Sequence, residues 1–123
     1  MRELLQVLKA GLEAAPALDV EPAVASAPFV YVTAIRSEAG LVRSLAGITL
    51  LSRELGFGRE AETLYSQDGR SATFHALHDR HAVALAVEVC PPRQTVSIAV
   101  SGSSNAETYG LFLEADARLF GPC

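Results

Sequence analysis

The chain has 123 residues and a mass of 13.0 kDa, and 50% of its residues are hydrophobic while 20% are charged, so we expect one folded domain over residues 1–123. Ten Lys and Arg against fourteen Asp and Glu give a net charge of −4, which argues against nucleic acid or an anionic membrane as the partner. The sequence contains neither a signal-peptide pattern nor a run of about 18 apolar residues, and we therefore expect a cytoplasmic protein.

The first predicted element is a helix over residues 2–15, which Pro16 ends. Its leucines recur at the spacing of one helical face, as in a helix that packs on one side only. These residues are Leu4, Leu5, Leu8 and Leu12.

Extended chain follows this helix and is punctuated by prolines. Residues 29–35 are rich in β-branched and aromatic side chains and predict a strand. A weaker strand over 20–25 can precede it. Because Pro22 lacks the N–H group that an inner strand donates, that weaker strand is restricted to a sheet edge.

A central helix is predicted from an N-cap at Ser37 to Leu55, where Gly56 ends it. Glu38 supplies a carboxylate in its first turn. At about 100° per residue, its apolar residues fall on two separate arcs. The second arc either touches a neighbouring element or forms an interface with a partner, and we favour the interface. The core stripe is Leu41, Leu45, Ile48, Leu51 and Leu55, and the second arc is Val42, Ala46 and Leu50.

Two tight turns join the next three predicted strands into a meander. Asp68-Gly69 is typical of a type I′ hairpin turn, and Asp79-Arg80 forms a second two-residue turn. The first turn sets Tyr65 opposite Ala72, Leu64 opposite Thr73 and Glu62 opposite His75, and the second sets Ala76 opposite Val83, Phe74 opposite Leu85 and His78 opposite His81.

Both faces of this meander are apolar, which implies helices above and below it. One face carries Ala72, Phe74, Ala76, Val83, Leu85 and Val87, and the other carries the smaller set Leu64, Thr73, Leu77, Ala82, Ala84 and Ala86.

The chain ends with a predicted strand over 95–100 and a last helix. Ser104 and Glu107 fit a capping box at the start of this helix. One stripe of the helix carries Tyr109, Phe112, Leu113 and Phe120. Together the elements predict an α+β fold with three α/β/α layers, in which a central, mostly antiparallel sheet of about five strands has helices on both faces.

Three histidines lie close together in the sequence, at His75, His78 and His81. His75 and His78 are an odd number of residues apart and would face opposite sides of a strand, so at best His78 and His81 form a surface pair across the turn. We therefore expect no metal, because structural zinc needs four protein ligands. Glu62 opposite His75 is interpreted as a pair that stabilises the sheet.

The loop Ser101-Gly102-Ser103-Ser104 leads into a helix N-terminus, where backbone N–H groups can bind a phosphate. It lacks the Gly-Lys-Ser/Thr of a nucleotide loop, and helix capping explains these residues without a ligand. No nucleophile motif or acidic metal cluster is present. We therefore expect a protein that is not an enzyme and has no cofactor.

The order and size of these elements resemble the Roadblock / dynein light chain family, especially its bacterial gliding-regulator (MglB-like) members. The resemblance covers Leu45-Ala46-Gly47 through Leu55-Gly56, then Glu62 to Gly69, then Ala82 to Val87 and the helix after Ser104. Residues 16–35 depart from the family pattern, because such domains usually show a tidy hairpin there and this chain has three prolines and no Asp-Gly. The resemblance implies a profilin-like, Roadblock-type fold.

The resemblance also implies a homodimer, in which the central helices pack together and the first meander strand pairs with its mate. Such proteins regulate or scaffold small Ras-like GTPases without an active site of their own. The dimer interface carried onto this sequence is Val42, Arg43, Ala46, Leu50, Arg53, Glu54, Thr63, Tyr65 and Gln67.

Two further alternatives follow from these residues. Arg43 or Arg53 could supply an arginine finger to a GTPase, but we favour an ion pair with Glu54. The competing function is a profilin-like module that binds a small ligand, which would require a pocket between sheet and helix with convergent polar groups.

Overall fold

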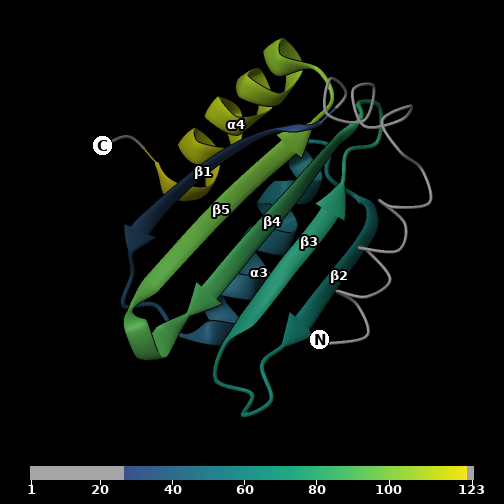
Figure 1. Cartoon of the computed structure of the whole chain (residues 1–123). Coiled ribbons are helices and arrows are strands. Elements are labelled where there is room, and N and C mark those ends of the chain that lie inside the picture. The colour runs from purple at the N-terminus through teal and green to yellow at the C-terminus, as the bar shows by residue number, and fades with distance from the viewer. Residues whose placement is uncertain (1–26, 122–123) are drawn as a thin grey trace, which may run out of the picture.

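The computed structural model describes residues 27–121, so the helix predicted over 2–15 and the weaker strand over 20–25 lie outside the described residues. Five strands form one antiparallel sheet in the order β1-β5-β4-β3-β2 (Figure 1). The predicted α+β class and the antiparallel sheet of five strands are confirmed. The elements are β1 (Phe29–Arg36), α3 (Leu41–Glu54), β2 (Arg59–Tyr65), β3 (Ala72–Leu77), β4 (Val83–Cys90), the short 3-10 helix η1 (Pro91–Arg93), β5 (Thr95–Gly102) and α4 (Asn105–Phe120).

The strand predicted over 95–100 is β5, which lies between β1 and β4 in the sheet. Every second side chain of this strand is fully buried, as the two-residue period of a strand requires. These side chains are Val96, Ile98 and Val100.

The hairpin of β2 and β3 has the predicted register, with Tyr65 opposite Ala72 and Glu62 opposite His75. Its turn is not type I′, because Asp68 has a negative φ and only Gly69 is left-handed, at φ 71°. Instead, the Gly69 N–H donates to the Ser66 carbonyl at 2.9 Å. The Asp68 carboxylate accepts from the Ser66 hydroxyl at 2.7 Å and from the Arg70 N–H at 3.1 Å.

The hairpin of β3 and β4 differs from its predicted register by two residues, with Ala76 opposite Leu85 and Phe74 opposite Val87. The two-residue turn at Asp79-Arg80 was therefore wrong. His78 folds inward and its ring closes a longer loop, because Nδ1 accepts the N–H groups of Arg80 and His81. A shift of two preserves which face each side chain occupies, so the predicted faces still hold.

Both described helices pack on the same face of the sheet. Leu45 and Ile48 of α3 and Ala115 of α4 belong to one buried cluster with the large side chains of β3, β4 and β5. The helix α3 lies over β3 and β4, and α4 lies over β5 and β1 (Figure 1). Within residues 27–121 the fold therefore has two layers, and the expected third layer is not among them.

The central helix starts later than predicted, with Gly40 rather than Ser37 as its N-cap. Ser37 does not cap it, because its hydroxyl accepts the N–H of Ala39, which precedes the helix. The predicted end is confirmed. Gly56 follows the helix at φ 95°, a conformation that favours glycine.

The open face of the sheet, opposite the two helices, carries small apolar side chains at its centre. The register places Ala84, Ala86 and Ala99 at its centre. Val30 and Val32 flank them on β1, where they are 56% and 64% exposed. Among the described residues nothing covers this face.

Candidate functional site

The second apolar arc of α3 faces solvent among the described residues. Val42 is 82% exposed and Leu50 is 58% exposed, while Leu45 and Ile48 on the opposite side of the same helix are buried. Ala46, between them on the arc, is also exposed. No described element therefore packs on this arc.

The two flanks of α3 meet different neighbours. One flank faces α4, since Glu54 pairs with Arg118 of α4 at 2.7 Å. Val42, Ala46 and Arg53 lie within about 40° of one another on the other flank, at about 100° per residue. Because α4 lies over β5 and β1, this second flank looks toward β2.

The predicted residues of β2 point to the same side of the sheet as α3. Thr63 is paired with Phe74 and Tyr65 with Ala72, and both partners are buried beneath the helices. Tyr65 is 63% exposed, and β2 is a free edge of the described sheet. We call the resulting patch the α3–β2 surface, which is made of Val42, Ala46, Leu50, Arg53, Thr63 and Tyr65.

The other three predicted interface residues lie elsewhere. Glu54 is on the α4 flank, and its partner is Arg118 rather than the predicted Arg43 or Arg53. Arg43 lines a hollow between the two helices. Gln67 is in the exposed turn between β2 and β3. The sequence alone could not separate these residues, because it does not say on which side of α3 the last helix packs.

The hollow between α3 and α4 has a volume of about 180 Å³. Arg43 is the single charged residue in its lining, and Ser37, Ser44 and Gly47 also contribute. Its apolar lining residues include Ile35 and Val96 from the sheet, Ile48 and Leu51 from α3, and Leu119 and Phe120 from α4.

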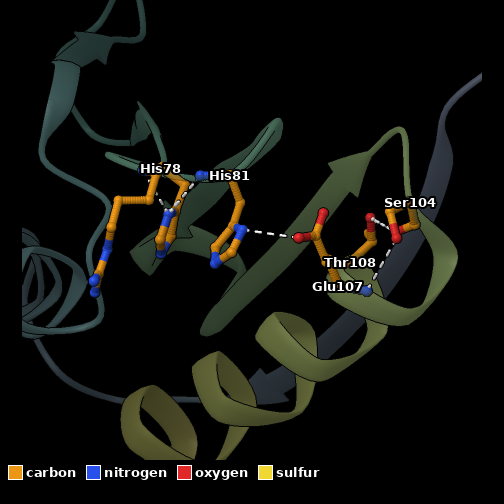
Figure 2. A network of polar contacts seen from close by, with 6 residues as sticks. His78, His81, Ser104, Glu107 and Thr108 are labelled. Carbon is orange, nitrogen blue, oxygen red and sulfur yellow. Dashed lines mark hydrogen bonds and ion pairs between the residues drawn. The ribbon is translucent and has the colours of Figure 1, made fainter.

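A polar network joins the β3–β4 loop to the start of α4 (Figure 2). His81 Nδ1 lies 2.9 Å from Glu107 Oε2. The Ser104 side chain accepts the Glu107 N–H, so the predicted N-cap is confirmed, but the Glu107 carboxylate turns to His81. The rings of His78 and His81 lie side by side, with centroids 4.8 Å apart.

His78 is buried, so the expectation of a surface residue was wrong. Its ring meets the edge of Phe57 in a T-shaped contact at 5.0 Å and lies against Gly56, where a Cβ would be 2.6 Å from Nε2. Burial lowers the pKa of His78, and the neighbouring His81 lowers it further. The neutral ring accepts two backbone N–H groups and thereby stabilises the loop.

The remaining polar candidates have structural partners. His75 Nε2 lies 3.6 Å from Glu62 Oε2 across the strands, as the register predicted. At the end of β5, a Cβ on Gly102 would overlap Thr108 and lie 2.8 Å from the Ala82 carbonyl oxygen. The close approach of backbone and helix thus explains this glycine without a phosphate.

Neither a metal-binding cluster nor a membrane-spanning helix occurs among the described residues. Residues 27–121 contain no group of three or more His, Cys, Asp or Glu side chains that could hold a metal ion. Neither α3 nor α4 has the length and apolar composition to cross a bilayer.

The sequence matches no family model, no curated protein and no solved structure.

The His78 ring makes stability depend on pH. Because the folded pKa lies below the unfolded value of about 6.5, the unfolded chain binds more protons as the pH falls through that range, and stability is lost. His81, Asp79 and Arg80 are the charged or titratable groups that act on this ring. We expect His78→Gln to cost about 1–3 kcal/mol at pH 7.5 and less at pH 5.

Urea unfolding of wild type and variant at both pH values measures this difference. His75→Gln, on the open face, is the matched control and should cost less than about 1 kcal/mol. Parallel pH profiles of wild type and His78→Gln would contradict the assignment.

Proposed function

We propose that this protein is a non-enzymatic homodimeric regulator or scaffold whose partner is a bacterial Ras-like small GTPase. The observation that carries the dimer is the α3–β2 surface, where an exposed apolar arc lies beside a free strand edge. An apolar helix face of this kind, with arginine and tyrosine at its border, has the composition of a protein interface.

The proposed dimer pairs α3 with its mate and β2 with its mate about a twofold axis. Strand β2 pairs regularly with β3 over Glu62–Tyr65. Toward the start of β2 this regular pairing is interrupted at Glu60, which has φ 52°. Pairing between subunits therefore uses the second half of β2. Leu50 lies on the side of α3 that points away from the sheet. A twofold contact between two α3 helices on that side brings Leu50 close to its mate.

A third layer is also part of the proposal. The Roadblock-type, three-layer fold needs a helix on the open face, and the amphipathic helix predicted over 2–15 is the segment of this chain that fits. Alanines at the centre of the face allow close approach of a helix, and its leucine stripe matches the exposed valines of β1.

The proposal that the partner is a GTPase rests on the resemblance to the Roadblock family. The proposed dimer of this acidic chain would present a broad twofold surface, which suits a protein partner better than small-molecule chemistry. The profilin-like sensor remains the second candidate, because the hollow beside Arg43 is a pocket between sheet and helix.

Leu50→Glu tests the dimer. Leu50 is 58% exposed in the single chain, so a glutamate there leaves the fold intact but places two like charges in the seam. We expect wild type to sediment as a dimer at tens of micromolar, a usual range for such contacts, and the variant as a folded monomer. Leu113→Glu on α4, at 46% exposure, is the matched control and should remain dimeric. A monomeric wild type, or a dimeric Leu50→Glu, would refute the interface.

Ala86→Gln tests the third layer. Ala86 is half-buried at the centre of the open face, and a longer polar side chain beneath a helix should cost about 1–3 kcal/mol of unfolding free energy. Glu88→Gln, on the same strand and face but exposed, should change it by less than about 0.5 kcal/mol. Chemical unfolding of the full chain measures both. Equal, small effects would mean that the face is solvated.

Binding to a purified GTPase tests the partner. The full chain is used to capture GTPases from the lysate of its own organism, and each is then loaded with GDP or a GTP analogue for calorimetry. We expect one GTPase to bind with at least tenfold different affinity in the two states, about 1.4 kcal/mol. Because we expect neither arginine to act as an arginine finger, Arg43→Ala and Arg53→Ala should leave the rate of GTP hydrolysis unchanged. Loss of an arginine finger would instead lower that rate about 10³–10⁵-fold. If no GTPase binds the chain, the proposal of a GTPase partner is refuted.

A further inference from the structure

The hollow between α3 and α4 combines an apolar interior with one cation. Isoleucine, leucine, valine and phenylalanine side chains form most of its wall, and Arg43 is the one charged residue that lines it. The two serines of the lining, Ser37 and Ser44, come from the same stretch of chain as Arg43. The polar groups of the hollow are therefore gathered in the segment 37–44.

Arg43 has no carboxylate partner within the described part of the chain. The acid on the same flank of α3 is Glu54, and its Oε2 is engaged by Arg118 at 2.7 Å. No ion pair of Arg43 occurs within residues 27–121. A guanidinium with free donors beside an apolar hollow matches a carboxylate in charge and in geometry.

Gly47 keeps one wall of the hollow open. It lies inside α3, where glycine is unfavourable by roughly 0.5–1 kcal/mol relative to alanine. A Cβ at this position would meet no atom within 4 Å, so neither packing nor a special backbone angle explains the glycine. The side chain that is missing here adds room to the hollow.

The size of the hollow limits its ligand. Its volume of about 180 Å³ is close to that of an engineered apolar cavity of about 150 Å³ that takes up benzene. A single ring or a chain of about six carbons fits that space, whereas a nucleotide does not. One cation and an apolar wall also disfavour a phosphate ester, which needs more charge.

We propose that this hollow binds a small apolar monocarboxylate, with its hydrocarbon part between α3 and α4 and its carboxylate on the Arg43 guanidinium. Ser44, whose side chain carries a hydroxyl donor, also lines this side of the hollow. Arg43 and Gly47 are not among the residues that define the α3–β2 surface. This inference stands whether or not the chain dimerises.

Titration of the full ¹⁵N-labelled chain with sodium hexanoate tests the site, followed by amide chemical shifts. We expect saturable shifts centred on Gly47, Leu51 and Phe120 at millimolar ligand. Hexanamide, which has the same chain but no charge, should bind about tenfold more weakly, as should hexanoate to Arg43→Met. Arg43→Met should leave the affinity for hexanamide unchanged.

Gly47→Leu fills the hollow and should abolish binding of both compounds while the chain stays folded. Gly110→Leu is the matched control, since Gly110 also lies inside a helix with open space around it but away from the hollow. Absence of saturable shifts, shifts centred elsewhere, or equal affinity for hexanoate and hexanamide would overturn the proposal. If Gly47→Leu does not fold, the Arg43→Met comparison decides the matter by itself.

Discussion

The alternation of side chains along β3, β4 and β5 is the constraint on which the rest of the structure depends. Successive residues of a strand point to opposite faces, and in these three strands most of the bulkier aliphatic and aromatic side chains, such as Phe74, Leu85 and Ile98, fall on one face. Both α3 and α4 bury their apolar stripes there. Because the two helices share a face, α3 has a neighbour on one flank only within residues 27–121. Its free arc and the hollow beside α4 both result from that arrangement.

Much of the fold can be predicted from local patterns in the sequence. The β2–β3 register depends on residues a few positions apart, and the Asp68-Gly69 pair gives it correctly even though the turn adopts another type. The β3–β4 register was wrong by two residues, yet every side chain kept its face. An even shift preserves the two-residue period, which makes the identity of the core a more robust prediction than the pairing.

The features that could not be predicted depend on contacts between distant parts of the chain. Ser37 satisfies the rules for a helix cap, but its N–H donates to the carbonyl of Gln94, almost sixty positions later, and the helix begins only after Gly40. The inward turn of His78 requires the space above Gly56. The nine residues expected at the interface include six that the structure brings together, while Glu54 and Arg43 belong to the side of α3 that faces α4. Local sequence does not tell which flank of a helix a later helix will occupy.

The two edges of the sheet differ, and the difference bears on whether the chain polymerises. Strand β1 exposes large apolar side chains along its length, including Val30 and Val32, whereas β2 carries Glu60 and Glu62. Joining β1 of one copy to β2 of the next would be a head-to-tail contact, which repeats without closing and yields a filament. The left-handed residue Glu60 breaks the regular geometry of β2, so an eight-residue β1 finds a matching edge for only part of its length. Within the described residues, the irregular pairing at Glu60 and the carboxylates of β2 therefore make this edge a poor match for β1 of another copy.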